Sequence, residues 1–505
     1  MSTNSESVAP TGPKTIAQGK EPSDAALGHG SHNRSSPEGA KEGGELPRGW
    51  RRVAIKNIAD SIQYGHTASA VDRKDGPRFL RITDIQDGRV DWSAVPSCDI
   101  AKADIPKYRL SSGDLVFART GATTGKSFLI GACPEAVFAS YLIRVRVSAD
   151  VDSRYLSAFF QSPDYWRQIE GGKRGIGQPN VNGTVLGEVQ FPVPPLPEQR
   201  RIVAEIEKQF TRLEAGVAAL RRVQANLKRY RAAVLKAACE GRLVPTEAEL
   251  AKIDKRKFET GEDLLARILT ERRKHWQGRG QYKEPAALDV TELEPLPEGW
   301  AWATLDALAA IKGGITKDQN RKHTAPSRSV PYLRVANVQR GYIDLAEVKE
   351  IVATEDEIQE LALKLGDILF NEGGDRDKLG RGWIWNGELS ECIHQNHVFR
   401  ARLYVDALNP KLVSWYANTF GQKFFFDEGK QTTNLASVSM SKLKGLPVPI
   451  PPAAEQTRIV AEVERRLSVV EELEAVVCAN LQRAARLRQS ILQKAFTGQL
   501  VARVG

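Results

Sequence analysis

The chain has 505 residues, of which 41 % are hydrophobic and 27 % are charged, and this length suits two or three globular domains. No apolar run approaches the about 20 residues of a membrane-spanning helix, and the N-terminus has no signal-peptide core, so we expect a cytoplasmic protein without a membrane partner. Five scattered cysteines form no CxxC pair, which argues against a disulfide framework and a zinc site. The net charge of +10 lies in the direction expected of a nucleic-acid partner, although Lys- and Arg-rich helix faces also occur in many other proteins.

Residues 1–45 are rich in Ser, Gly, Pro and charge and hold almost no large apolar side chains. Such a segment cannot bury enough surface to fold, so a disordered tail is predicted. Folded structure is predicted to begin at Leu46–Trp50 (LPRGW), which recurs as LPEGW at Leu296–Trp300.

Two globular domains, residues 46–196 and 296–452, repeat each other segment by segment. Each has short β-type runs broken by a turn, then a strand, a glycine-rich loop and a strand, then a further strand and a helical stretch. The matching segments are Pro77–Asp91 with Val330–Asp344, Leu110–Gly131 with Leu363–Trp385, Ser140–Val147 with Asn396–Leu403, and Ser153–Ile169 with Pro410–Phe425. A repeat of this length indicates duplicated domains, and each is predicted to be a mixed α/β (α+β) globule.

A long helix is predicted after each globule, over residues 197–240 and 453–505. Each follows a proline-rich run, which disfavours helix just before it, and the openings EQRRIVAEIE and EQTRIVAEVE share eight of ten residues. Apolar residues then recur at alternating steps of four and three, which is typical of a coiled-coil seam. The polar seam positions are Gln224, Arg231, Glu474 and Arg488. We expect the two helices to pair with each other, with these residues fixing the register.

Residues 241–295 are charged and irregular, with one predicted helix at Gly261–Trp276. We interpret them as a structured linker, with a partner-docking element as the alternative.

No catalytic constellation is found. The GATTGKS run (Gly121–Ser127) resembles a P-loop, but its glycine spacing is wrong, and it is predicted to lead into a strand rather than a helix. The HQNH run (His394–His397) has no companion carboxylate or cysteine set, so a polar contact is a better interpretation than a metal site. The loops instead offer Arg, Lys, Asn, Gln and Thr, which bind phosphates and base edges, although ordinary polar surface has the same composition.

The order of globule, PPLPEQRRIVAEIE helix, linker, globule and PPAAEQTRIVAEVE helix resembles the specificity (S) subunit of type I restriction–modification enzymes. The GDLVFARTGATTGK and GDILFNEGGDRDKLGRG loops are similar to those of the family's target-recognition domains. So are RGIGQPNVNG and GKQTTNLASV before the proline runs, and the helix ends KAACEGRLV and KAFTGQLV.

The resemblance implies that each target-recognition domain reads one half of a bipartite double-stranded DNA target, and that the two helices form an antiparallel coiled coil. Two modification subunits, which bind S-adenosylmethionine and methylate adenine at N6, would dock on the helices. Restriction subunits using ATP and Mg would then join as the endonuclease. The chain itself would be non-catalytic and hold no cofactor. Because the two glycine loops differ, the two half-sites are expected to differ.

Carried onto this sequence, the resemblance marks polar residues of the loops as candidate DNA contacts. In the first domain they are Arg81, Arg119, Thr120, Thr123, Thr124, Lys126, Gln178 and Asn180; in the second they are Arg334, Asn337, Asp375, Arg376, Lys378, Arg381, Gln431, Thr432 and Asn434. Some, such as Arg81, could instead pair within the fold. The alternative function is a coiled-coil scaffold that binds protein and reads no DNA.

Overall fold

The computed structural model describes residues 46–502 except 74, 87, 122, 172–180, 277–279, 317–325, 375–378, 429, 433 and 434. The chain divides into two compact units: the first unit holds residues 46–224 and 475–502, and the second unit holds residues 225–474. The predicted tail lies outside the described residues. So do six candidate contacts, namely Gln178, Asn180, Asp375, Arg376, Lys378 and Asn434.

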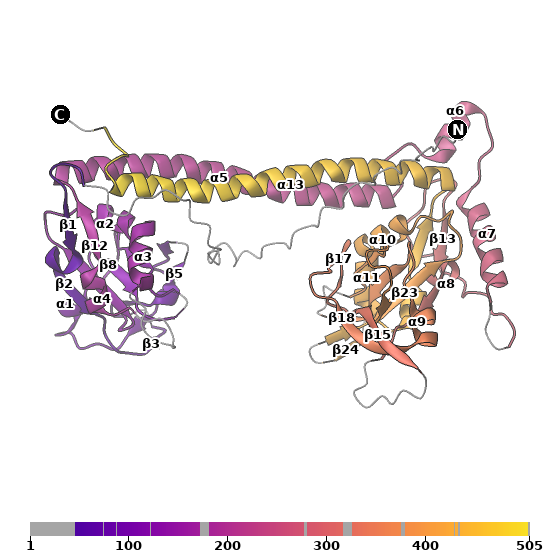
Figure 1. Cartoon of the computed structure of the whole chain (residues 1–505), viewed down its shortest axis with the longest axis horizontal. Helices are drawn as coiled ribbons and strands as arrows, with labels where there is room; N and C mark the ends of the chain where they lie inside the picture. Colours follow the sequence, from indigo (N-terminus) through magenta and orange to yellow (C-terminus); the bar gives the residue numbers. More distant parts are fainter. Residues whose placement is uncertain are drawn as a thin grey trace, which may run out of the picture. The chain divides into compact units, whose positions relative to one another are not determined.

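The first unit contains short strands, small helices and one half of each long helix (Figure 1). Its strands are β1 (Arg51–Ala54), β2 (Ala59–Tyr64), β3 (Ala70–Val71), β4 (Arg78–Leu80), β5 (Ile85–Gln86), β6 (Arg89–Val90), β7 (Ser97–Cys98), β8 (Leu115–Ala118), β9 (Ser127–Leu129), β10 (Ala136–Phe138), β11 (Leu142–Val147) and β12 (Gln190–Val193). Its helices are the 3-10 turns η2 (Ile55–Asn57) and η3 (Ile82–Asp84), then α1 (Ile105–Tyr108), α2 (Ser153–Phe159), α3 (Pro163–Gly171) and α4 (Gly183–Glu188).

The second unit has the following strands and helices. The strands are β13 (Ala301–Thr304), β14 (Ala309–Lys312), β15 (Ser327–Leu333), β16 (Val338–Gln339), β17 (Tyr342–Ile343), β18 (Lys349–Thr354), β19 (Ile368–Asn371), β20 (Gly373–Gly374), β21 (Gly382–Ile384), β22 (Ile393–His394), β23 (Val398–Leu403), β24 (Lys430–Thr432), β25 (Leu435–Ser437) and β26 (Pro447–Ile450). The helices are α6 (Glu247–Asp254), α7 (Gly261–Lys274), α8 (Leu305–Leu308), α9 (Glu355–Leu361), α10 (Pro410–Thr419), α11 (Gly421–Glu428) and α12 (Met440–Lys444).

The two units share their main sheet and three further strand pairings, which confirms the predicted duplication, whereas β3 of the first unit and the small sheet β20-β25-β24 of the second have no counterpart among the described strands. The four-stranded sheet β2-β11-β8-β9 of the first unit corresponds to β14-β23-β19-β21 of the second. The parallel pair β10–β4 corresponds to β22–β15, the hairpin β5–β6 to β16–β17, and the closing pair β1–β12 to β13–β26. The predicted helical stretches are each divided into two helices, α2 with α3 and α10 with α11. The short helices α4 and α12, which lie just before the proline-rich runs, were not predicted.

A buried aspartate and a partly exposed arginine cross-link the central strands in the same way in both units. In the first unit, Asp114 receives hydrogen bonds from Arg146 Nε at 2.8 Å and from its terminal nitrogen at 3.2 Å. In the second unit, Asp367 binds Arg402 through two hydrogen bonds of 2.7 Å. The aspartate of the Gly-Asp pair that precedes β8 and β19 therefore stabilises the fold in both units. A buried carboxylate needs such a partner because burial disfavours its charge.

The two long helices, α5 (Leu196–Cys239) and α13 (Ala453–Phe496), pack antiparallel as predicted (Figure 1). In the first unit the start of α5 and the end of α13 enter one core, through Ile202, Ile206, Ile491 and Ala495 among others. In the second unit the end of α5 meets the start of α13. No helix in the described part of the chain is long and apolar enough to cross a membrane.

Three of the four polar seam positions, Arg231, Glu474 and Arg488, pair between the helices. In the second unit, Arg231 donates to Glu474 at 3.1 Å. In the first unit, Arg488 donates to Glu214 at 3.1 Å and lies over the Phe210 ring at 3.9 Å from its centroid. These ion pairs favour the observed register, because a shifted helix would lose them.

A buried glutamine fixes the start of each long helix against its own globule. The Gln199 side chain accepts a hydrogen bond from Asp152 N–H at 2.8 Å and donates to the Asp150 and Pro194 carbonyls. Gln456 accepts from Asn409 N–H at 2.8 Å and donates to the Pro451 carbonyl. The EQ motif of both copies thus joins helix to globule.

The segment predicted as a linker packs onto the second unit. Leu264 and Ile268 of α7 are fully buried in the same core as α8 and β26. Helix α6, missed in the sequence, begins against α13, where the Glu247 N–H donates to the Glu455 carboxylate at 2.8 Å. The apolar residues of this segment therefore complete the core of the second globule.

Candidate nucleic-acid interface

The glycine loop of the first unit, residues 119–126, leaves β8 and leads into β9. Gly121 and Gly125 both have positive φ angles, 84° and 85°. The Thr124 hydroxyl donates to the Gly121 carbonyl at 2.6 Å, and the Tyr165 hydroxyl donates to the Gly125 carbonyl at 2.6 Å. The loop is therefore held by its own hydrogen bonds, and because a strand follows it, it lacks the helix N-terminus that a P-loop uses for phosphate.

Arg119 is the first residue of this loop and is positioned by an aromatic ring. Its guanidinium lies 5.1 Å from the Tyr64 ring centroid, a cation–π distance, and the Tyr64 hydroxyl accepts from Gly183 N–H at 2.8 Å. Thr120 and Thr123 are half-buried, whereas Lys126 is exposed. Within the described residues no carboxylate pairs with Lys126, so its ammonium group faces solvent beside Arg119's loop.

Arg81, on the turn after β4, is committed to the fold. Its guanidinium donates to both oxygens of Asp84, at 3.0 and 2.7 Å. This hydrogen bonding, with a smaller contribution from Tyr141, raises the pKa of Arg81. Arg81 therefore pairs within the fold, which is the alternative that the sequence left open for it. We leave Arg81 out of the proposed contact set.

In the second unit the same turn carries Arg334 and Asn337. Asn337 is buried: its oxygen accepts from Arg334 N–H at 2.9 Å, and its amide donates to the Asp344 and Glu347 carbonyls. Arg334 itself donates to the Glu347 carbonyl at 3.0 Å. Asn337 is buried and both of its amide hydrogens are used within the fold, so we leave it out of the proposed contact set as well.

At the base of the second glycine loop, Glu372 occupies the place of Arg119. The Arg119 N–H donates to the Tyr141 carbonyl at 3.0 Å, and the Glu372 N–H donates to the His397 carbonyl at 3.0 Å. The Glu372 carboxylate also holds His397 Nδ1 at 2.6 Å. Tyr141 was missed in the sequence, and His397 was interpreted only as a polar contact of the HQNH run; aligning the repeated strands residue by residue would have placed both beside the loops.

The remaining candidates of the second unit are only partly described. Arg381 is half-buried and donates to the Val335 carbonyl at 3.3 Å. Gln431 and Thr432 lie on β24, which pairs with β25, while β25 also pairs with β20 of the glycine loop. The structure therefore brings the two predicted loops of this unit together in one small sheet. Whether these residues touch DNA stays a prediction.

The histidines of the HQNH run do not form a metal site. His394 is fully buried, with Nδ1 donating to the Val398 carbonyl at 2.7 Å, and burial lowers its pKa to about 4. His397 is exposed and paired with Glu372. Among the described residues no group of three or more His, Cys, Asp or Glu is arranged to hold a metal ion.

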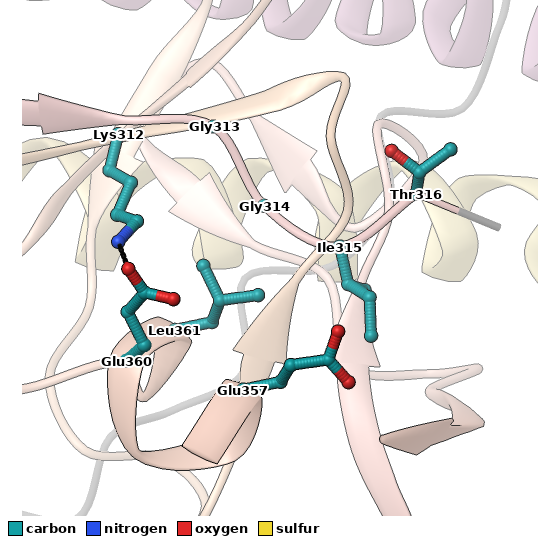
Figure 2. Close-up of a pocket in the computed structure, with 8 residues that line it drawn as sticks. All are labelled: Lys312, Gly313, Gly314, Ile315, Thr316, Glu357, Glu360 and Leu361. Carbon is teal, nitrogen blue, oxygen red and sulfur yellow. Dashed lines mark hydrogen bonds and ion pairs between the residues drawn. The ribbon is translucent and has the colours of Figure 1, made fainter. Parts of the chain in front are cut away.

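A hollow of about 470 Å³ lies in the second unit between the end of β14 and helix α9. Figure 2 shows that Lys312 reaches Glu360 across it. Glu357 accepts from Thr354 N–H at 3.0 Å as part of the cap of α9. Gly314 is required for close packing, because a Cβ there would meet the His394 carbonyl oxygen at 1.8 Å. The two carboxylates and the lysine of the lining thus serve the fold, and the hollow does not support a small-molecule site.

With this geometry established, comparison with known proteins is informative. Residues 47–219 match the family described as the type I restriction modification DNA specificity domain. Relatives extend the match over the whole repeat: the EcoKI specificity subunit of Escherichia coli K12 is 24 % identical over 476 residues, 91 % of each chain. Over both repeats, the chain is similar to the type I restriction–modification specificity subunits.

Further specificity subunits of this family match to similar extents. The StySPI subunit of Salmonella potsdam is 23 % identical over 91 % of each chain. The putative MjaX subunit of Methanocaldococcus jannaschii is 31 % identical over 178 residues, 34 % of this chain and 41 % of its own. A solved chain from a study of complex assembly and conformational transition of the type I R-M system has a TM-score of 0.59 at 21 % identity, covering 90 % of this chain and all of its own. This last likeness supports the fold of the specificity subunit.

Proposed function

We propose that the chain is the DNA-specificity subunit of a type I restriction–modification complex and that its two globules read two different half-sites. The observation that carries this is a contrast within the molecule. The two units share sheet topology, the Asp–Arg cross-link and the glutamine at the helix start. Their glycine loops, at equivalent places, differ in charge and hydrogen-bonding groups.

The contrast favours readout over symmetric scaffolding. A scaffold that bound one protein twice would present similar groups on both globules. Here the first loop begins with Arg119 and ends with Lys126, while the second begins with Glu372 and continues through DRDKLGRG. Discrimination of base pairs depends on which donors and acceptors enter the groove, so unlike loops on like frames are suited to unlike sequences.

Partner subunits are proposed to dock on the helix pair. Beside the seam, α13 carries apolar side chains that stay exposed, namely Val469, Leu473, Val476 and Leu487. The first three are spaced by four and three residues and lie on one face of the helix. Exposed apolar stripes are unusual on a monomer surface, and this one fits an amphipathic helix of each modification subunit. Methylation, ATP hydrolysis and cleavage would belong to the partners.

The test is methylation mapping of DNA from cells that express the chain with its modification subunits. We expect one bipartite motif with unlike halves. Arg119→Ala should relax one half-site and Arg376→Ala the other, each by about 1–3 kcal/mol of discrimination. The matched control is Arg52→Ala on β1. This substitution removes an ion pair with Asp164 of α3 and should leave the motif unchanged.

Two results would contradict the proposal. An active complex with no bipartite motif would favour the scaffold. Equal relaxation of both half-sites by Arg119→Ala would show that this loop does not read its own half of the target.

A further inference from the structure

Beside each glycine loop, one exposed side chain occupies the same backbone position in the two units: Tyr141 in the first and His397 in the second. Each immediately precedes the strand, β11 or β23, that pairs with the strand leading into the loop. The carbonyls of both residues accept a 3.0 Å hydrogen bond from the first loop residue, Arg119 or Glu372. The loop and this position are therefore joined through the main chain.

Both side chains are exposed where their neighbours are not. Tyr141 is 38 % exposed although the next residue, Leu142, is fully buried. The His397 side chain is 55 % exposed, and Val398 after it is fully buried. An aromatic ring with a hydroxyl and an imidazole ring are both able to donate and accept hydrogen bonds. The fold thus exposes a polar ring at the same position in both units.

The His397 ring is oriented by Glu372. An ionised carboxylate only accepts, so the proton of the 2.6 Å contact belongs to Nδ1. This contact leaves Nε2 for another partner, because the hydrogen bond of one ring nitrogen sets the state of the other. The Asn396 amide lies 3.5 Å from Nε2, which is the limit of a hydrogen bond. The nitrogen suited to an outside partner is therefore Nε2.

Tyr141 lies beside the first glycine loop. Arg119, joined to Tyr141 through the main chain, has its guanidinium 5.1 Å from the Tyr64 ring centroid. One arginine and two tyrosines are thus placed at this loop.

We propose that Tyr141 and His397 are a matched pair of base-reading residues, each contacting a base in the half-site of its own globule, with Glu372 positioning the imidazole. This inference rests on the proposed DNA readout and adds two specificity-determining positions outside the glycine loops. In the first half-site the contact comes from a hydroxyl, and in the second from imidazole Nε2.

The experiment compares Tyr141→Phe, His397→Phe and wild type in the assembled methylase, by methylation mapping and by competition between single-base variants of the target. Each substitution keeps a ring and removes the hydrogen-bonding group. We expect His397→Phe to reduce discrimination at one base pair of one half-site by at least about 5-fold, and Tyr141→Phe to do so in the other half-site. His275→Phe, on an exposed histidine at the end of α7, is the matched control.

Glu372 supplies a second readout. Glu372→Gln keeps an acceptor for Nδ1 and should retain most of the discrimination, whereas Glu372→Ala should lose it to the extent of His397→Phe. Thermal unfolding of each variant is measured alongside.

The outcomes separate the two proposals. A wild-type complex without a bipartite motif would overturn the proposed function, and this inference with it. A wild-type bipartite motif that both Phe variants leave unchanged would overturn this inference alone. A uniform loss over all sequences with a shallower salt dependence would indicate a phosphate contact, and a loss matched by lower unfolding temperature would indicate a structural role; both overturn base reading.

Discussion

The buried His394 allows a test of the second unit in which the chain supplies its own control. His394 lies on β22, fully buried, with Nδ1 donating to the Val398 carbonyl and no hydrogen-bond partner for Nε2 among the described residues. The equivalent position on β10 of the first unit is Phe138, also fully buried. His394→Phe therefore installs a side chain that the repeat already accommodates.

The magnitude follows from the pKa of His394, which burial lowers from 6.5 to about 4, with the nearby Arg400 acting in the same direction. The unfolded chain binds a proton near pH 6.5 and the folded chain only near pH 4. Stability from this group is thus full above pH 6.5 and is lost as pH falls toward 4. At 1.36 kcal/mol for each pH unit, the loss is about 3 kcal/mol in total and about 2 kcal/mol by pH 5.

The assay is urea unfolding of wild type and His394→Phe at pH 7.5, 6 and 5, followed by tryptophan fluorescence. At pH 7.5 we expect the variant to lie within about 1.5 kcal/mol of wild type, since one hydrogen bond is removed. The difference should then shift by about 2 kcal/mol in favour of the variant at pH 5. Taking the difference cancels titrations common to both proteins. A difference that is independent of pH would refute the assignment of His394 as a neutral buried group.

Three further predictions concern packing, register and binding. Gly65→Ala and Gly314→Ala should each prevent correct folding, because the added Cβ would lie 2.2 Å from the Phe138 carbonyl oxygen in the first case and 1.8 Å from the His394 carbonyl oxygen in the second. Gly216→Ala, on the open face of α5 with nothing within 4 Å, should instead raise the free energy of unfolding by about 1 kcal/mol. Thermal melting followed by circular dichroism distinguishes the two results. Arg231→Glu and Glu474→Arg should each weaken the helix pair, and the double variant should recover the stability of the wild type. The coupling energy should be below about 1 kcal/mol, because both side chains are about one-third exposed. A double-mutant cycle showing no coupling would contradict the pairing. Specific binding by the assembled complex should fall steeply with salt and should exceed that of the chain alone, and gel shifts in which the lone chain binds as tightly would count against the partner subunits closing around DNA.

The sequence by itself determined the elements that depend on local spacing. The apolar steps of four and three placed three of the four ends of the long helices within one residue, since a helix turns regularly and only one stripe can meet a partner. The remaining end, predicted at residue 505, lies at Phe496. The sequence also predicts that the polar seam residues Arg231 and Glu474 help to set the register, and the two side chains are in contact. The duplicated segments fixed the order of strands, because two copies of one pattern fold to one topology.

Only the tertiary structure decided which polar residues face outward. Asn337 and Arg81 look like ligands of DNA in the sequence, but backbone carbonyls and a carboxylate from the same turns use their donors. In the sequence Tyr141 looks like an ordinary strand residue and His397 like a local polar contact, and the packing of distant strands leaves both exposed beside the loops. The exposure of a side chain depends on which segments from distant parts of the chain pack over it. The spacing of apolar residues carries no information about that packing. The same reason explains α6 and α7, whose place in the second globule depends on a core completed by residues up to two hundred positions away.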